Sequence, residues 1–484
     1  MTTVVPQEAP HLIEQFLPHD PSILWLVVCS FVLAFILAFA VGANDVANVF
    51  GTSVGAGAIS LRGACIIATV AEILGSVLIG YKVSETMRKG IIDIDLYENS
   101  EKVLMLGSLA ALGGSALWNL LATFLSLPIS GTHTIVGATI GFSLVARGMQ
   151  GVSWLTFGKI VGSWFVSPIL SGGISVCLFL LVRHLVLRSR DPVKSGLKAL
   201  PFFYGFTVIV NVFSVLHDGP RLLHLDHLPL WIVILASMVV GTLVAGIIQI
   251  VLVPRLRQKH KGNEATSSSQ LTTISQPDSV LENGSTAKLN DQDMTTGRPP
   301  NPDQKNVSAE VEDSPAVSRL FASLQIMTAT FGSFAHGGND VSNAIGPLVA
   351  VWLIYSDGSV VQKSETPIYI LLYGGVGISV GLWVWGRRVI KTVGQDLTQL
   401  TTSSGFTIEL GAAFTVLMAS KIGLPISTTH CKVGSVVFVG WTKSSSSGVD
   451  WHVFRNIVLA WLVTVPFSAG SSAAIMALLL KVAA

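Results

Sequence analysis

The chain has 484 residues, of which half are hydrophobic and only 12% are charged. A soluble protein carries about twice that charged fraction, so the composition excludes an ordinary soluble domain and predicts an all-α polytopic membrane protein. The net charge of +2 is small, and no nucleic-acid partner is expected. The four cysteines stand singly, without the spacing of a metal site or a disulfide framework.

The first apolar run, Ile23–Ala43, could span a membrane, and weakly polar residues continue from it to Leu61 without a loop. A single helix from residue 23 to residue 61 would be about 58 Å long, whereas the hydrocarbon core of a bilayer is about 30 Å thick. We therefore expect the helix to break at Gly42, beside the polar residues Asn44 and Asp45.

Apolar segments recur along the rest of the chain and indicate further helices, several of them long enough to span a membrane. Before a long polar stretch they cover residues 64–83, 103–127, 129–145, 157–187, 201–216 and 230–253. After it they cover residues 320–335, 344–355, 368–385, 406–424, 433–441 and 453–480.

The polar stretch, residues 258–316, differs in composition from everything around it. It has no Phe, Trp or Tyr and is rich in Ser, Thr, Pro, Asn and Asp. Such a segment cannot bury a core, and we interpret it as a disordered linker. The linker divides the chain into an N-terminal tail with a first membrane half, residues 1–22 and 23–257, and a second membrane half, residues 317–484.

Basic residues near the helix ends predict the topology. One basic loop covers Arg188–Lys198, and a second group, Arg255–Lys261, stands at the start of the linker. Two candidate spans separate these groups, so both lie on one side of the membrane, and an excess of Lys and Arg marks that side as cytoplasmic. The linker is then cytoplasmic, and its glycosylation sequons at Asn283 and Asn306 are expected to be unused.

Two motifs occur twice. Gly42–Gly51 and Gly337–Gly346 each place a carboxylate and two carboxamides directly after an apolar run. The segment Leu127–His133 recurs 297 residues later as Leu424–His430, and the same offset relates Trp154 to Trp451 and Trp164 to Trp461. Duplication in a membrane protein is typical of a transporter built from two repeats, and a charged group at membrane depth marks a functional site.

The Gly-Asn-Asp motifs suit a hard cation. In the first motif, Asn44, Asp45 and Asn48 share one face of a helical turn. The second motif repeats them as Asn339, Asp340 and Asn343. Carboxylate and carboxamide oxygens are ligands of the kind that Na⁺ takes, and flanking glycines let backbone carbonyls join them. A hydrogen-bonded polar kink that packs helices together is the alternative.

The Leu-Pro-Ile-Ser motifs suit an anion. Ser130 and Ser427 follow a proline and are good N-caps, and hydroxyls cluster directly after them. The following apolar segments are short, as in a re-entrant hairpin, and such a half-helix would direct N–H groups and hydroxyls at an anion. The alternative is an ordinary turn outside the membrane that joins two spans.

Further ionisable residues lie in or beside apolar segments. Glu72 and Glu409 could be cation ligands, proton carriers or partners of a buried base, for which the candidates are Lys159, Lys421 and Lys432. Three histidines, His133, His336 and His430, stand close to the motifs, as accessory or proton-carrying groups or as neutral hydrogen-bond donors. No hydrolase, zinc-protease or phosphate-cradling signature is present, so we do not expect an enzyme.

The doubled motifs resemble those of the inorganic phosphate transporter (PiT) family. Similarity to its animal sodium–phosphate symporters lies in Arg88–Asp93, Ile408–Leu410 and Ser427–Gly434. The resemblance implies two inverted repeats with broken helices and two re-entrant hairpins, a homodimer in the plasma membrane, termini outside and the linker inside. The linker is short for an animal member, and the sequence around Asn99 lacks the sequon that relatives often carry there.

The implied function is sodium-driven uptake of monovalent inorganic phosphate, with no cofactor besides co-transported Na⁺ and membrane lipid as the surroundings. The expected phosphate ligands are Ser130, Gly131, Thr132, Thr134, Ser427, Thr428, Thr429, Asn48 and Asn343. The expected sodium ligands are Asn44, Asp45, Asn339, Asp340, Glu72 and Glu409. Family members also serve as retrovirus receptors. The alternative is a proton-coupled symporter of phosphate or another tetrahedral oxyanion, in which Glu72 or Glu409 carries the proton.

Overall fold

The computed structural model describes residues 17–217, 225, 227–258, 313–391, 396–444 and 448–483. Most of the predicted N-terminal tail, residues 1–22, and most of the predicted linker, residues 258–316, lie outside these described residues. The described residues are helical and form no β-sheet. Eight of their helices are long and apolar enough to cross a membrane, which confirms an all-α polytopic membrane protein.

The helices of the first half are α1 (Leu24–Gly55), α2 (Leu61–Ile79), α3 (Tyr81–Glu85), α4 (Glu101–Phe124), α5 (Gly131–Arg147), α6 (Trp154–Val182), α7 (Pro192–Leu216) and α8 (Leu230–Ile247). Those of the second half are α10 (Pro315–His336), α11 (Ser342–Asp357), α12 (Ile368–Trp385), α13 (Arg387–Lys391), α14 (Thr402–Lys421), α15 (Thr428–Lys443) and α16 (Trp451–Ala483). Short 3₁₀ or π turns are η1 (Pro21–Ile23), η2 (Thr86–Gly90), η3 (Ile94–Tyr97), η4 (Gly148–Gly151), η5 (Arg183–Leu187), η7 (Ile248–Leu252) and η9 (Gly337–Val341).

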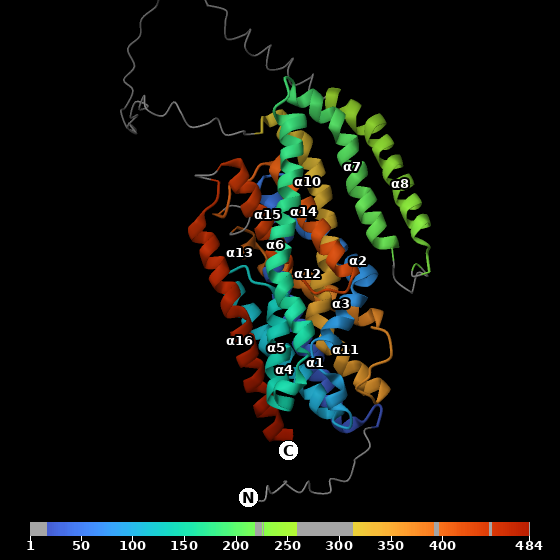
Figure 1. Ribbon diagram of the computed structural model, residues 1–484, viewed down its shortest axis with the longest axis vertical. Helices are drawn as coiled ribbons and strands as arrows, with labels where there is room; N and C mark the ends of the chain where they lie inside the picture. The colour runs from blue at the N-terminus through green and yellow to red at the C-terminus, as the bar shows by residue number, and fades with distance from the viewer. Residues whose placement is uncertain are drawn as a thin grey trace, which may run out of the picture.

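Helices from the two halves of the chain interleave in one bundle (Figure 1). Helix α16, from the second half, packs along α5 and α4 of the first. Helix α6, from the first half, packs against α15 and α14 of the second, and α1 packs against α12. Helices α7 and α8 form a hairpin on one flank of the bundle. The centre of the molecule is therefore built from both halves.

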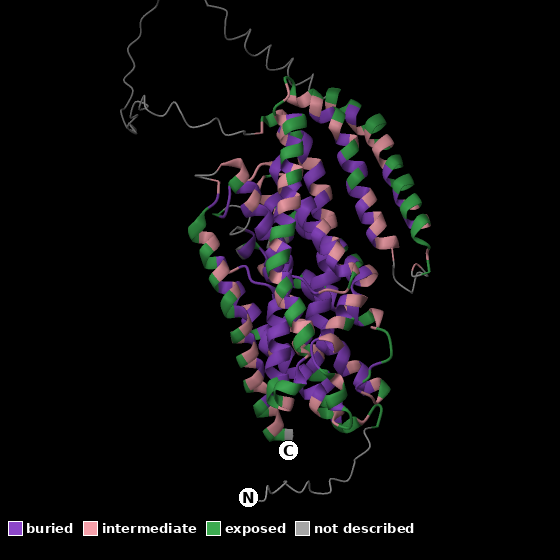
Figure 2. Ribbon diagram, in the orientation of Figure 1, coloured by how far each residue is buried: buried purple, intermediate pink, exposed green. Residues whose placement is uncertain are grey.

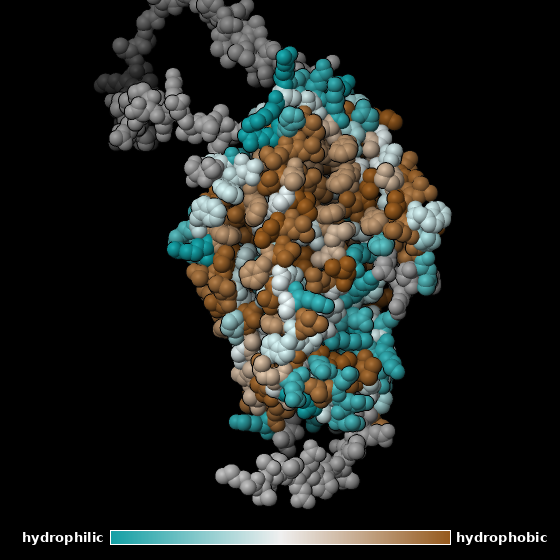
Figure 3. Space-filling model, viewed as in Figure 1, coloured by the Kyte–Doolittle hydropathy of each residue, from teal (hydrophilic) through white to brown (hydrophobic). Residues whose placement is uncertain are grey.

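Burial and hydropathy fit a membrane environment. Buried residues fill the middle of the bundle, whereas α8 exposes much of its surface (Figure 2). The exposed residues of α8 include large apolar side chains such as Trp231, Leu235 and Leu243. Hydrophobic residues cover a broad band of the visible face, and hydrophilic residues gather toward its two ends (Figure 3). Apolar side chains on such a surface are stable in contact with lipid rather than water.

The predicted break in the first long helix is wrong. Helix α1 continues from residue 24 to residue 55, and its 32 residues pass through the Asn44-Asp45 motif without interruption. Gly42 serves a close helix crossing instead, because a Cβ on it would lie 2.0 Å from the backbone oxygen of Ile378 on α12. In the second copy, by contrast, the π turn η9 interrupts the α-helical path between α10 and α11. Only one of the two motifs is therefore irregular.

Two helices begin earlier than their apolar pattern predicts, because a cap and a proline start them. Helix α7 begins at Pro192 rather than at residue 201, and the carboxylate of Asp191 accepts a hydrogen bond from the backbone N–H of Lys194 (2.9 Å). Helix α10 begins at Pro315, inside the predicted end of the linker, with Ser314 as its cap. A proline at the first position of a helix loses no hydrogen bond, so both starts are favourable.

Candidate functional site

The two Leu-Pro-Ile-Ser segments end in capped helix starts, as predicted. The hydroxyl of Ser130 accepts a hydrogen bond from the N–H of His133 (3.3 Å) at the start of α5. The hydroxyl of Ser427 accepts one from the N–H of His430 (3.0 Å) at the start of α15. Both caps are buried, so these helix N-termini open inside the protein.

The two starts bind each other reciprocally. The hydroxyl of Thr132 donates to the carbonyl of Ile426 (2.9 Å), and the hydroxyl of Thr429 donates to the carbonyl of Ile129 (2.8 Å). Each residue of one contact lies 297 positions from its counterpart in the other contact, which is the offset of the sequence duplication. The duplicated segments therefore make equivalent contacts with each other at the centre of the bundle.

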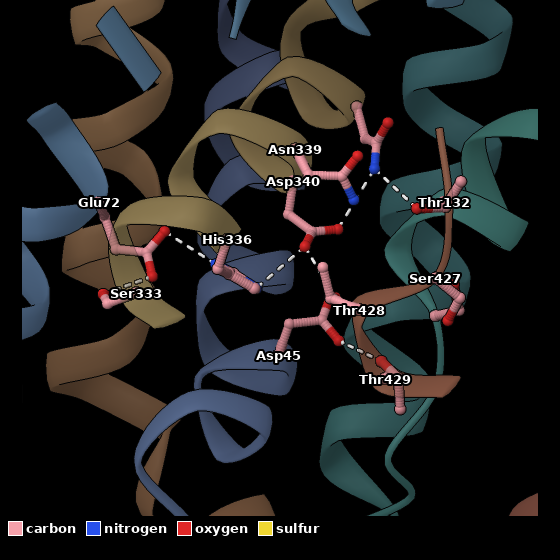
Figure 4. Close-up of polar contacts among 12 residues, drawn as sticks. Asp45, Glu72, Thr132, Ser333, His336, Asn339, Asp340, Ser427, Thr428 and Thr429 are labelled. Atoms are coloured by element: carbon pink, nitrogen blue, oxygen red, sulfur yellow. Dashed lines mark hydrogen bonds and ion pairs between the residues drawn. The ribbon is translucent and has the colours of Figure 1, made fainter. Parts of the chain in front are cut away.

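Asp340, in η9, has polar contacts with three side chains of this centre (Figure 4). It accepts hydrogen bonds from the hydroxyl of Thr428 (2.8 Å) and the amide of Asn343 (3.2 Å). One oxygen also lies 3.2 Å from Nε2 of His336, one turn earlier. Asp340 thus joins the second Gly-Asn-Asp motif to the start of α15.

Asp45 lies close by, on α1. Its carboxylate accepts a hydrogen bond from the hydroxyl of Thr429 (3.0 Å). One ligand atom from each of Asp45, His336 and Asp340 lies within 4.8 Å of the other two, close enough to surround a single ion. Gly131 lets the start of α5 come close to Asp45, because a Cβ on it would lie 3.1 Å from Oδ2 of Asp45. Two fully buried carboxylates this close repel each other unless a positive charge lies between them.

The asparagines hold the capped starts in place. Asn44 donates to the carbonyl of Leu127 (2.9 Å) and accepts from the N–H of Ile129 (3.0 Å). Asn339 donates to the carbonyl of Ile426 (2.9 Å), and Asn343 donates to the hydroxyl of Thr132 (2.7 Å).

The carboxamide oxygens of Asn339 and Asn343 are buried without a hydrogen-bond partner among the described residues. A buried acceptor in this condition is costly unless it has a ligand to bind. These two oxygens therefore remain available to a cation or to a ligand that donates a hydroxyl hydrogen. The side chain of Asn48 lies outside the described part of the chain.

Glu72 and Glu409 each have a basic partner. Glu72, on α2, accepts a hydrogen bond from Ser333 (2.8 Å) and lies 2.8 Å from Nδ1 of His336. His336 thus stands between two carboxylates, and its imidazole can donate to both only when both ring nitrogens carry hydrogen. Glu409, on α14, is bonded to the ammonium of Lys432 and the hydroxyl of Thr52.

The three candidate bases and the three histidines have different positions. Among the described residues Lys432 pairs with Glu409, whereas Lys421, twelve residues after Glu409 on α14, donates to the carbonyl of His217 (2.6 Å), and Lys159 is exposed on α6. The rings of His133 and His430 lie against each other, with centroids 4.4 Å apart, and each packs on a tryptophan at 3.8 Å. His336, by contrast, belongs to the carboxylate centre.

Several contributing residues carry no motif in the sequence. Thr134 accepts hydrogen bonds from Asn119 (2.8 Å) and Ser115 (2.9 Å), which buttress the start of α5 from α4. Ser333 and Thr52 bind the two glutamates. Ser333 precedes His336 by three residues, and this helical spacing was the one signal that could have connected them.

A bundle of membrane-spanning helices with paired carboxylates and two helix N-termini meeting at its buried centre defines a class of protein, the polytopic ion-coupled transporters. The model of the Phosphate transporter family matches residues 41–472, so the chain belongs to this family.

Relatives match over nearly their whole length. The chain is 43% identical to sodium-dependent phosphate transporter 1-A of Danio rerio, over 94% of this chain and 95% of that protein. It is 41% identical to sodium-dependent phosphate transporter 2 of Xenopus tropicalis, over 94% and 98%. A solved structure titled "The sodium-dependent phosphate transporter" is similar with a TM-score of 0.77 and 36% identity, covering 94% of this chain and 99% of that one.

Proposed function

We propose that this protein is a sodium-coupled symporter that brings inorganic phosphate, in its monovalent form, into the cell. The observation that carries the proposal is the meeting of two capped helix N-termini with the carboxylates of Asp45 and Asp340. Helix N-termini and hydroxyls are donors that an oxyanion accepts, and carboxylates with carboxamide oxygens are ligands for Na⁺. The named relatives and the family membership support the same cargo.

The cation side consists of Asp45 and Asp340 with Asn44 and Asn339. Glu72 and Glu409 line this side, Glu72 through His336 and Glu409 through the ammonium of Lys432 that it binds. The anion side consists of the hydroxyls and N–H groups at the two helix starts, contributed by Ser130, Gly131, Thr132, Thr134, Ser427, Thr428 and Thr429, together with Asn48 and Asn343.

Electrostatic repulsion predicts that sodium binds before phosphate. Phosphate that approached Asp45 and Asp340 without a cation would meet two buried negative charges, and this repulsion is strong where the dielectric constant is low. Sodium removes the repulsion, and the bound pair of opposite charges then crosses the membrane at a lower cost than either ion alone. The transport of the two ions is therefore coupled. A site that is empty or holds both ions can change its access from one side of the membrane to the other, and a site that holds only one ion cannot.

The arrangement of the protein in the membrane belongs to the same proposal. We place the chain in the plasma membrane as two inverted repeats with re-entrant hairpins, acting as a homodimer and moving one repeat assembly against the other. The reciprocal contacts of the two helix starts support a two-fold relation. The beginnings of α7 and α10 lie at the end of the molecule opposite the C-terminal end of α16, which supports a cytoplasmic linker and an external C-terminus (Figure 1).

Replacing sodium by choline at constant pH should reduce labelled phosphate uptake by at least about tenfold. Without sodium the two aspartates keep their negative charge or take up protons, and neither state provides the cation that the anion site needs. Uptake into cells that express the protein, compared with cells that do not, measures this directly. Undiminished uptake in choline would favour the proton-coupled alternative, with Glu72 or Glu409 as the proton carrier.

Ser130→Ala and Ser427→Ala should each raise the phosphate concentration for half-maximal uptake by about tenfold, and should change the sodium dependence less. Each change removes a cap and a donor from the anion side, and a lost cap alone costs about 1 kcal/mol of helix stability. Uptake is measured against phosphate at fixed sodium and against sodium at fixed phosphate. A larger effect on the sodium dependence than on the phosphate dependence would refute the anion assignment. Ser60→Ala, which removes the exposed cap of α2 away from this centre, is the matched control.

A further inference from the structure

The ion pair of Glu409 and Lys432 lies beside the proposed transport centre and, together with Thr52, joins three helices. Glu409, on α14, is fully buried, and its two oxygens face the ammonium of Lys432 on α15 and the hydroxyl of Thr52 on α1. Lys432 stands one helical turn after Thr428, whose hydroxyl binds Asp340. The ammonium of Lys432 is thus held one helical turn from the residue that binds Asp340, a proposed sodium ligand.

Packing leaves a small space next to this ion pair. A cavity of about 20 Å³ lies where α1, α10, α14 and α15 meet, and Glu409, Lys432, His336 and Thr428 contribute to its walls. This volume holds about one water molecule, or a dehydrated ion of similar size. Gly332, on α10, also lines the space, and a Cβ on it would occupy part of it, in van der Waals contact with Oε2 of Glu409 (3.5 Å). The cavity connects the ion pair to the side of the centre that His336 and Thr428 form.

The oxygen atoms of Glu409 and of Thr52, which is hydrogen-bonded to it, are of the kind that a sodium ion takes. A carboxylate and a hydroxyl are hard oxygen ligands, and an adjacent water-sized cavity could supply another. The ammonium carries the same unit charge as Na⁺ and donates to Oε2 of Glu409, while the hydroxyl of Thr52 donates to Oε1 of the same carboxylate. In the described structure Lys432 therefore satisfies a site that would otherwise need a free cation.

We propose that Glu409 forms a third cation site, which the protein fills with its own ammonium, and that Lys432 thereby limits the number of sodium ions carried with each phosphate. The inference rests on the proposed sodium-coupled function and concerns its stoichiometry. Removing the ammonium leaves a buried carboxylate without a counter-charge, which is unstable in a low-dielectric interior. In a sodium solution the vacant site recruits Na⁺ through the adjoining cavity.

The test compares the full-length protein with Lys432→Met, Glu409→Gln and the double variant. Methionine removes the charge at a similar side-chain length, and the double variant removes both charges together. Uptake of labelled sodium and of labelled phosphate is measured in parallel. Lys432→Met should carry one more sodium ion per phosphate than the parent and should depend more steeply on sodium concentration. The double variant should return to the parental ratio, because it has neither the acid nor the ammonium.

A binding measurement supports the flux measurement and does not require transport. The Tm of each purified protein is measured in sodium chloride and in choline chloride without phosphate. Ligands that bind only the folded protein raise its Tm. Sodium should therefore raise the Tm of Lys432→Met by several degrees more than it raises that of the parent, and the double variant should lose this gain. A Lys432→Met protein that can be purified only in sodium would also support the proposal.

Two results would overturn the inference. One is a Lys432→Met variant with the parental sodium-to-phosphate ratio and the parental response of Tm to sodium. The other is a Lys432→Met variant that cannot be purified in either salt while the double variant can, because that pattern defines an ion pair with a purely structural role. A parent whose uptake does not need sodium would instead refute the proposed function, and the Tm comparison would still decide whether Glu409 is a cation site.

Discussion

Asp340→Asn should reduce sodium-dependent phosphate uptake by about 100-fold, a factor that corresponds to about 2.7 kcal/mol. Asparagine keeps the shape of the side chain but removes the negative charge that neutralises Na⁺. It also replaces one carboxylate oxygen by an NH₂ group, so that either the hydrogen bond from Asn343 to Oδ1 or the contacts of Thr428 and His336 with Oδ2 are lost. Asp45→Asn should have an effect of the same order, because the two carboxylates lie close enough together to bind the one sodium ion that we propose. Uptake of labelled phosphate at matched surface expression measures both effects.

Asp357→Asn is the matched control for these two variants. Asp357 is an exposed aspartate at the end of α11, the helix that follows η9, and it makes a hydrogen bond with Ser356. Its replacement should leave uptake within about twofold of the parent, since surface substitutions away from special features change stability little. Uptake close to that of the parent in both Asp45→Asn and Asp340→Asn would remove the basis for the cation assignment.

Gly337→Ala should destabilise the protein by about 3 kcal/mol, at the upper end of the effect of overpacking a tight interior. The added Cβ would lie 2.2 Å from the backbone oxygen of Glu72 and 2.7 Å from its Cα. Helix α2 must then move away from η9, and this movement separates Glu72 from His336. We expect a lower Tm in detergent and loss of most phosphate uptake, although no charged or polar side chain has changed.

Gly246→Ala provides the comparison. Gly246 also lies within a helix, α8, but a Cβ there meets nothing within 4 Å. Alanine is the better helix former, so this variant should be as stable as the parent or more stable by up to about 1 kcal/mol. Equal Tm and equal uptake in Gly337→Ala and Gly246→Ala would show that the close contact of α2 with η9 is not needed.

The elements of the site that depend on neighbours in sequence were predictable. The Ser130 and Ser427 caps follow from a proline, a serine and the residues after them, and the structure confirms both. The duplication predicted that Asp45 and Asp340 belong to one site, because two equivalent polar motifs in a membrane protein are most stable where they meet, away from the lipid. Composition was sufficient to predict a helical membrane protein, because a chain with so few charged residues cannot cover its surface with polar side chains as a soluble protein does.

The contacts that span the chain were not predictable. Thr52 and Glu409 lie 357 positions apart, and three lysines could have been the partner of Glu409 until packing placed Lys432 beside it. The sequence did not distinguish His336 from His133 or His430 as a candidate site residue. Only the packing of α2 on α10 and η9 puts His336 between two carboxylates.

The sequence by itself determined a helical membrane protein with two equivalent polar motifs and two capped helix starts, because hydropathy, capping and duplication are local properties of the chain. Only the tertiary structure decided that α1 passes through its motif unbroken, since the role of Gly42 depends on a helix that arrives more than 300 residues later. It also decided which base accompanies each buried acid. A buried charge is stabilised by whatever group packing brings to it, and packing joins residues that the sequence keeps apart.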